Sequence, residues 1–320
     1  MPYTQVANLD FNEIKTTLKE YLRAQSDFTD YDFEGSTLSI LLDTLAYNTY
    51  YTAFNTNLVV NELFIDSATL RDNVVAIAKQ LGYRPKSATS PTAYVSFTVT
   101  YSNPTTDTEL LLKKGTGFTA TYENRLFNYV VLEDVKAQVA NGVATFSDVA
   151  INEGTQLTNT FTVNSASKSQ RFVLDNQNID TNTISVRVYP TGGSFNEPYL
   201  VADNILGVDA TSKVFFLDEI EDERYEILMG DGVLGKKLEN NARIEVSYLV
   251  TSGPESNGVR TFTFSGVLEN PDGVSPSSFT IALNSIVAAA GGEEIESTKK
   301  IKNTAPKAYG TQDRAVTAQD

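Results

Sequence analysis

The sequence predicts an α+β protein, with an N-terminal helical region followed by mainly antiparallel β domains. Two observations carry this prediction. Up to about residue 84, apolar residues recur with the 3.6-residue period of a helix. From Thr92 onward the period changes to two, which is typical of half-buried strands. The 320 residues are 41% hydrophobic, so the chain has enough apolar side chains to bury ordinary cores.

Two of the predicted helices each carry a single apolar stripe. In the first, Ile14, Leu18, Tyr21 and Leu22 fall at i, i+4, i+7 and i+8, and Asn12 is placed to cap the N-terminus. Another helix is expected over residues 67–81, where apolar residues repeat the same spacing before a glycine and a proline end it.

The helix between them, which begins near Ser36, has apolar residues on two sides. At 100° per residue, a leucine group lies on one side and a mostly aromatic group lies about half a turn away. The first group is Leu38, Leu41, Leu42 and Leu45, and the second is Tyr47, Tyr50, Tyr51, Phe54 and Leu58.

A helix in a small bundle normally keeps one face inward, so two explanations for this pattern stay open. Either the helix is enclosed in its own domain or broken near Asn48, or one of its faces contacts a partner chain. We treat these nine residues as the candidate partner interface, because aromatic side chains bury a large area with few rotors to freeze.

The β region shows alternating runs separated by turn signals. The runs are centred on Phe97, Val186 and Val246, where apolar and polar residues take turns. Asn141-Gly142 lies between two such runs, as a tight hairpin requires. We therefore predict a first β domain over residues 91–165 and a second over 166–268.

The remaining segments complete the predicted domain organisation. Residues 1–90 form a helical oligomerisation region, and residues 269–320 read as a linker and the start of a further, incomplete domain. Within the latter we expect a strand near 279–287 and a short helix over 293–302.

Composition narrows the classes of function. The chain has 25 Lys+Arg against 40 Asp+Glu, giving a formal charge of −15, so we expect no nucleic-acid binding. It has no His and no Cys, which removes Ser-His-Asp and Cys-His catalysis, disulfides and zinc sites of the usual kind. No run approaches the roughly 18 apolar residues of a membrane-spanning helix, and the first residues lack the layout of a signal peptide. We expect folding in the cytoplasm, no membrane, no cofactor and no metal.

Two motifs invite a chemical reading and favour a structural one. The acidic run over residues 218–223 reads as a solvated connection, because like charges there repel one another. The segment GDGVLG lacks the Lys-Ser/Thr of a phosphate loop and the spaced acids of a calcium loop. We interpret it as a structural turn formed by Gly230, Asp231, Gly232 and Gly235. No catalytic residue is predicted.

Three stretches carry a family resemblance. Residues 31–83, beginning YDFEGSTLSILLDTL, resemble the N-terminal helical region of baseplate wedge proteins of T4-like contractile-tailed phages. Residues 225–258, YEILMGDGVLGKKLENNARIEVSYLVTSGPESNG, are similar to the wider baseplate J-like family, and residues 291–320 resemble a junction between its β domains. T4-type members continue well past the point matching Asp320, so the resemblance covers their N-terminal and central part.

The resemblance implies a non-enzymatic structural subunit of the virion tail baseplate, assembled in the host cytoplasm. Its expected partners are a second copy of itself and another baseplate wedge protein, joined through helices into a three-chain bundle. Six such wedges would close a ring around the tail hub, next to sheath-initiator-type and hub-proximal baseplate proteins, and support sheath attachment and contraction. The alternative is a receptor-binding or glycan-degrading tail protein, which would concentrate aromatic residues on β loops. A generic enzyme would instead need a pocket with shifted carboxylates.

Overall fold

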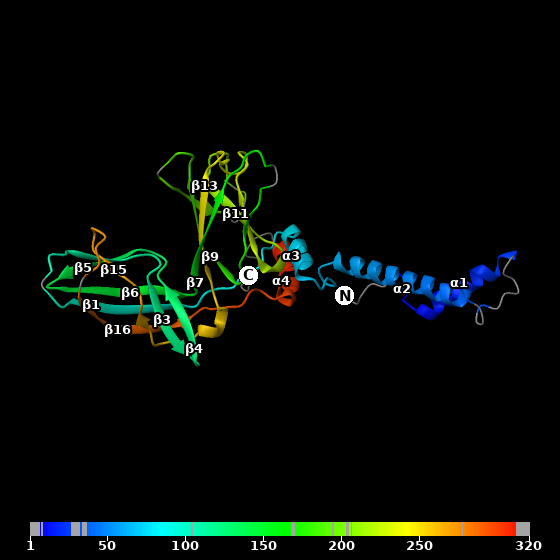
Figure 1. The fold of residues 1–320 in the computed structure, drawn as a ribbon, viewed down its shortest axis with the longest axis horizontal. Coiled ribbons are helices and arrows are strands. Elements are labelled where there is room, and N and C mark those ends of the chain that lie inside the picture. Colours follow the sequence, from blue (N-terminus) through cyan, green and yellow to red (C-terminus); the bar gives the residue numbers. More distant parts are fainter. Residues whose placement is uncertain are drawn as a thin grey trace. The chain divides into compact units, whose positions relative to one another are not determined.

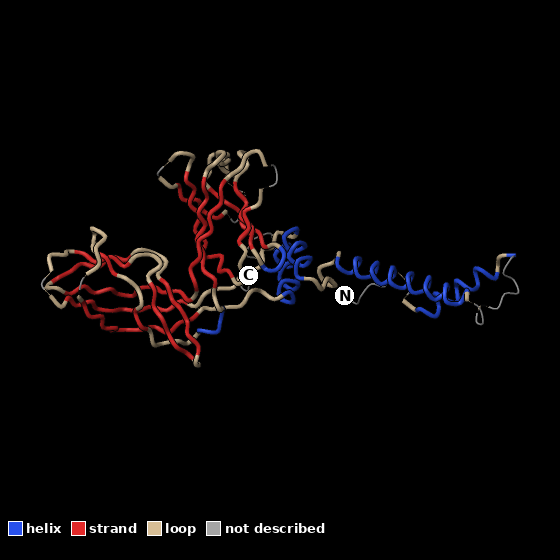
Figure 2. Tube along the Cα trace, in the orientation of Figure 1, coloured by secondary structure: helices blue, strands red, loops and turns tan. Residues whose placement is uncertain are grey.

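The computed structural model contains two compact units, Met1–Pro85 with Ser297–Asp320 and Lys86–Glu296. The residues that it describes are 7, 9–26, 33, 37–103, 105–167, 170–193, 195–202, 205, 207–276 and 278–311. Helices make up the described part of the first unit, and strands dominate the second (Figures 1 and 2). The predicted α+β class is therefore confirmed.

The first two helices of the helical unit are α1 (Phe11–Arg23) and α2 (Leu38–Glu62), which pack against each other (Figure 1). Of the apolar stripe predicted for α1, Ile14, Leu18 and Leu22 are half-buried, whereas Tyr21 is exposed. The predicted cap was wrong by two residues. Asp10 caps α1 by accepting the backbone N–H groups of Asn12 and Glu13 at 2.8 and 3.1 Å, because a carboxylate before the first turn reaches both donors.

Helix α3 (Arg71–Gln80) packs against α4 (Thr298–Thr311), the last described helix. Their small core joins Val74 and Ala78 of α3 to Ile301 and Ala305 of α4. Both helices differ from prediction at their ends: α3 begins at residue 71 instead of 67, and α4 begins at 298 and runs beyond 302. A segment more than 200 residues away in sequence thus completes the core under α3, which no local pattern indicates.

The larger sheet of the β unit is built from both ends of that unit. Among the described residues its strands follow the order β14-β3-β4-β6-β5-β2-β15, while β1 pairs with β6 on one side and β16 on the other. They are β1 (Thr92–Tyr101), β2 (Glu109–Leu112), β3 (Gly117–Tyr122), β4 (Arg125–Val130), β5 (Val135–Ala140), β6 (Val143–Glu153), β14 (Thr263–Phe264), β15 (Leu268–Glu269) and β16 (Phe279–Ala290). Asn141 and Gly142 form the predicted hairpin between β5 and β6, both with the positive φ that such a turn requires.

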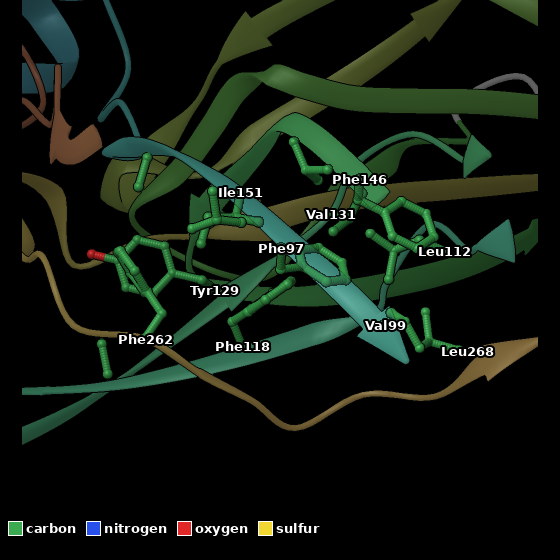
Figure 3. Packing of buried hydrophobic residues seen from close by; sticks show 14 of the residues in the cluster. Phe97, Val99, Leu112, Phe118, Tyr129, Val131, Phe146, Ile151, Phe262 and Leu268 are labelled. Carbon is green, nitrogen blue, oxygen red and sulfur yellow. The ribbon is translucent and has the colours of Figure 1, made fainter. Parts of the chain in front are cut away.

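Aromatic rings fill the core of this sheet (Figure 3). Phe97 stacks on Phe146 with ring centroids 4.8 Å apart and meets Phe118 edge-on at 5.9 Å. Tyr129 and Phe262 form a second edge-on pair at 4.9 Å. The alternation seen in the sequence of β1 therefore corresponds to a buried inner face.

The second sheet has the order β7-β13-β9-β10-β11-β12-β8, with the single parallel pair β10–β11 among its described strands. Its strands are β7 (Thr155–Thr162), β8 (Phe172–Leu174), β9 (Ile179–Tyr189), β10 (Glu197–Val201), β11 (Val214–Glu219), β12 (Tyr225–Met229) and β13 (Arg243–Val250). The rings of Phe161 and Phe172 lie 5.5 Å apart, which brings the two end strands β7 and β8 close together around one core.

The sheets do not follow the segment boundaries expected from sequence. The first sheet takes residues 92–153 and also 263–290, so the piece predicted as a linker supplies strand β16, and β15 lies across its predicted start. The second sheet lies between these two parts of the chain, from residue 155 to 250. Pairing between strands distant in sequence is set by tertiary packing, and local alternation does not reveal it.

Buried carboxylates join the two sheets. Glu153, at the end of β6, accepts the Thr251 hydroxyl at 2.6 Å and the Ser252 backbone N–H at 2.9 Å. Asp180, in β9, accepts the backbone N–H and the hydroxyl of Ser90 at 2.8 and 2.7 Å. Each carboxylate accepts hydrogen bonds from several donors, so the buried backbone N–H groups have partners where the chain crosses between the sheets.

The acidic run over residues 218–223 is less uniform than the predicted solvated loop. Asp218 and Glu219 belong to β11, and Glu219 is buried. Only Glu221–Glu223 form an irregular turn, a short 3-10 segment before β12. The strand extends further than expected because β12 pairs with it as far as Glu219.

Candidate interaction surface on helix α2

Helix α2 is one uninterrupted helix of 25 residues, so it is not broken at Asn48. Its buried side is a single stripe of mostly small or polar residues. These are Leu42, Ala46, Ala53, Asn57 and Asn61. Small side chains let α2 pack closely against the rest of its own unit, while its larger apolar side chains point away from this contact.

The first uncovered side of α2 is an aromatic face, which we define as Ile40, Tyr47, Tyr51, Phe54 and Leu58. Their spacings of seven, four, three and four residues place them on one line along a helix, as in the seam of a coiled coil. Tyr47 is 55% exposed and Phe54 45%. The rings of Tyr47 and Tyr51 lie 4.7 Å apart at 65°, and the neighbouring Tyr51 hydroxyl raises the pKa of Tyr47.

The second uncovered side is a leucine face, which we define as Leu41, Leu45 and Val59, all exposed. Exposed Asn48 and Thr52 lie between them on the same side of the helix. At 100° per residue this face lies roughly 120° from the aromatic face. The described helix α2 is therefore apolar on three sides and covered by its own unit on one.

The structure divides the nine residues predicted for this interface into three groups. Leu42 is buried at 1% exposure and packs within its own unit. Leu38 and Tyr50 are half-buried, and Tyr50 meets Tyr51 edge-on with ring centroids 6.1 Å apart. The exposed residues are Leu41, Leu45, Tyr47, Tyr51, Phe54 and Leu58. The interface assignment stays a prediction for these six.

Sequence reasoning missed two members of the uncovered faces. Ile40, at 67% exposure, extends the aromatic face, and Val59, at 61%, extends the leucine face. Both were discoverable, because Ile40 lies seven residues before Tyr47 and Val59 lies fourteen after Leu45. Heptad spacing is the signal that reveals both residues, whereas the angle between two apolar groups does not.

Polar contacts hold the far end of α2 in place. Glu62, its last residue, accepts the Thr69 N–H at 2.7 Å, the Thr69 hydroxyl at 2.6 Å and the Asn73 amide at 2.8 Å. Partial burial opposes ionisation of Glu62, but the hydrogen bonds from Asn73 and Thr69 outweigh it and lower its pKa to about 2. Leu70, before α3, provides no side-chain cap, so Glu62 stabilises the start of α3 in its place.

The GDGVLG segment forms a turn in the β unit. The Asp231 carboxylate accepts the backbone N–H groups of Leu234 at 2.9 Å and Val233 at 2.8 Å, and these bonds lower the pKa of Asp231. Gly230 and Gly235 touch backbone to backbone, since a Cβ on Gly230 would lie 2.3 Å from the Gly235 carbonyl carbon. The carboxylate of this segment is thus engaged by its own backbone.

Two other features would point to a different kind of site, namely a cluster of metal ligands and a membrane-spanning helix. Within the described ranges, no three or more Asp and Glu side chains gather in a way that would hold a metal ion. None of the described helices is long and apolar enough to cross a membrane.

Comparison with known proteins identifies the helical region. Residues 10–83 match the family described as baseplate wedge protein gp6-like, helical domain. These residues are similar to the helical domain of gp6-like baseplate wedge proteins. The resemblance to T4-type wedge proteins is thereby confirmed, and α1, α2 and α3 all fall within the matched residues.

Two further comparisons cover most of the chain. The baseplate wedge protein gp6 of Enterobacteria phage T4 is 29% identical over 328 residues, which cover 97% of this chain and 48% of that protein. The chain thus spans about half the length of this relative. A cryo-EM structure of the anti-feeding prophage baseplate aligns with 98% of the chain and 63% of its own at 12% identity. Its TM-score of 0.29 is too low to carry an argument about the fold.

Proposed function

We propose that this chain is a non-enzymatic structural subunit of a phage tail baseplate wedge, and that α2 is the surface through which it binds other wedge proteins. One observation carries the proposal. A helix inside the gp6-like domain leaves its aromatic and leucine faces uncovered while burying mainly small residues against its own unit.

Leaving these apolar side chains in contact with water is unfavourable in free energy, and burial by another chain would remove that contact. Fully burying a large apolar side chain contributes about 1.5–3 kcal/mol, and each of these side chains is already about half covered. Roughly 1 kcal/mol per side chain is therefore available on association, and eight side chains together outweigh much of the entropy lost on binding.

The angle between the faces supports two partners. Because the aromatic and leucine faces lie roughly 120° apart, two different helices can pack against α2 at once, one on each face. We propose that a second copy of this chain and another wedge protein supply these helices. Asn48 and Thr52 on the leucine face would then help to fix the register, since polar residues in an apolar seam disfavour shifted pairings.

Wider assembly roles follow from the relationship to wedge proteins. We propose that wedges containing this chain form a ring around the tail hub in the host cytoplasm, and that the ring contacts sheath-initiator-type and hub-proximal proteins. In this role the chain would support sheath attachment and contraction. The relative from phage T4, described as a baseplate wedge protein, supports the location in the virion tail baseplate.

Mutation of the aromatic face tests the proposal. The double variant Tyr47→Ser/Phe54→Ser, co-expressed with the other wedge proteins of the same phage, should form no wedge complex on size-exclusion chromatography. Tyr50, which is half-buried, is a poorer choice because its loss also perturbs the unit itself. Normal assembly of the double variant would contradict the assignment of α2 as the interface.

A matched control separates loss of binding from loss of folding. Tyr309→Ser removes an exposed tyrosine from α4, outside both faces of α2, and should leave wedge assembly unchanged. Both proteins should keep the far-ultraviolet circular dichroism of the wild type. A wild-type chain that binds or cleaves host polysaccharide would instead support the alternative of a receptor-binding or glycan-degrading tail protein.

A further inference from the structure

Strand β16 forms an edge of the larger sheet. It pairs with β1 along its length, and no described strand pairs with its other side (Figure 1). The twelve residues Phe279–Ala290 make it the longest strand of the β unit among those described. Free edges of this length expose backbone donors and acceptors that can pair with another chain.

The hydrogen bonds around β1 show which atoms of β16 are free. Tyr101 donates its N–H to Gly142 on the β6 side at 2.9 Å, and Ser102 donates to Ser278 at 3.1 Å. In an antiparallel ladder the direction alternates, so Thr280 faces β1 and its neighbours Phe279 and Ile281 direct their backbone N–H and C=O outward.

At one end of this edge the backbone groups already have hydrogen-bond partners. Ala289 donates its N–H to Val259 at 2.9 Å and accepts the N–H of Gly258 at 2.7 Å. Among the described residues, the outer side of β16 from residue 279 to 287 has no such backbone partner. The open stretch is thus long enough for a strand of ordinary length.

The core under this edge is incompletely covered. Phe279, Ile281, Leu283 and Ile286 pack against the buried cluster yet stay only half-buried. An added strand would bury them by placing its own alternate side chains beside them. On the outer face, Tyr94 and its cross-strand neighbour Val287 are also exposed.

The sequence of the edge lacks the usual protection against pairing. Neither β1 nor β16 contains a charged residue or a proline, although the chain is 20% charged. Proteins normally place lysines, prolines or inward-pointing charges on long edge strands to prevent association. Their absence indicates that this edge is meant to be paired.

We propose that the open edge of β16 binds an extended segment of another protein by strand addition. The segment has apolar side chains at alternate positions and carries no acidic residues. The chain carries a formal charge of −15, so a neutral or basic segment is favoured over an acidic one, and pairing with a second copy is an outcome of the test below. This inference does not depend on α2 being an interface.

A peptide probe tests the proposal on the full chain. The probe copies residues 92–101, TAYVSFTVTY, with one lysine added at each end, because β1 is the strand whose alternation already fits β16. We expect the probe to slow hydrogen exchange of backbone amides over residues 279–287. The same peptide with N-methyl groups at alternate residues, which removes its donors, should bind at least tenfold more weakly.

A pair of variants tests whether binding of the probe depends on the edge strand β16. Ala282, Thr98 and Thr145 lie in one cross-strand row, with Ala282 on β16 and exposed Thr145 two strands away on β6. Ala282→Lys should weaken binding of the probe about tenfold, and Thr145→Lys should leave it unchanged. Both should unfold at the wild-type denaturant midpoint.

Three outcomes would overturn the inference. They are no exchange protection at β16 with the probe, equal binding of the plain and N-methylated peptides, and equal binding of the probe by both lysine variants. A wild-type dimer in sedimentation that Ala282→Lys converts to a monomer would also contradict it, by making a second copy the occupant. None of these results bears on assembly through α2, so the two proposals fail separately.

Discussion

Helix α2 and strand β1 use apolar residues in opposite ways. All four inward residues of β1, Ala93, Val95, Phe97 and Val99, are fully buried. Helix α2 is more than twice as long, yet the apolar residues it buries are one leucine and two alanines. The β unit is stabilised by its own core, whereas α2 leaves most of its large side chains exposed. We propose that stability and assembly belong to different parts of the chain.

The largest expected effect comes from the core that surrounds β1. Phe97→Ala removes a ring that stacks on Phe146 and should lower the free energy of unfolding of the β unit by about 3–5 kcal/mol. Phe54→Ala on α2 deletes the same atoms from an exposed position and should cost under about 1 kcal/mol. Urea denaturation of the two variants measures the difference. Equal losses would show that α2 is packed as tightly as β1.

A smaller effect is expected at the turn between β12 and β13. Gly230→Ala brings a Cβ to within 2.3 Å of the Gly235 carbonyl carbon, so the backbone must move apart, at a cost of about 1–3 kcal/mol. Gly310→Ala on α4 meets nothing within 4 Å and, because it lies in a helix, should not lower stability, so it serves as the control. A lowered thermal midpoint for Gly230→Ala alone is the expected result. An unchanged midpoint for both would contradict the described packing of this turn.

The smallest effect concerns the joint between α2 and α3. Glu62→Gln replaces the ionised acceptor that holds Thr69 and Asn73, and should cost about 1 kcal/mol at neutral pH. The pKa of Glu62 falls from 4.5 to about 2 on folding, so its contribution is fully present above pH 4.5 and is lost as the pH falls toward 2. Unfolding of the helical unit between pH 6 and pH 2 should therefore depend more steeply on pH in the wild type than in Glu62→Gln. Parallel pH profiles would contradict this role.

Local patterns predicted much of the fold. The alternating residues of β1, β9 and β13 form strands, and Asn141-Gly142 forms the expected hairpin, because backbone preference and burial agree at these positions. The turn at Gly230 follows from glycine content in the same way. These features are determined by residues close together in the chain, so the sequence alone predicts them.

Long-range pairing was not predictable from these patterns. The strand expected near residues 279–287 exists, but nothing in it indicates that it pairs with β1, nearly 190 residues earlier. The return of α4 to α3 is hidden for the same reason. A single sequence reports periodicity, and partners distant in sequence are selected by the shape of the core.

The candidate surface on α2 was predicted in part. Six of the nine chosen side chains are exposed, and the helix is continuous. Leu42 was misplaced because a 25-residue helix with apolar residues all round gives no periodic signal to separate its own core from its outer faces. The structure resolves this by showing which side α1 covers.

Hydrogen exchange of α2, measured in the isolated chain and in purified baseplates, tests the central claim most directly. The account predicts that amides of residues 40–59 exchange rapidly in the free chain and become strongly protected in the baseplate, while those of β1 are protected in both. Protection of α2 that equals that of β1 in the free chain, and does not increase on assembly, would contradict it.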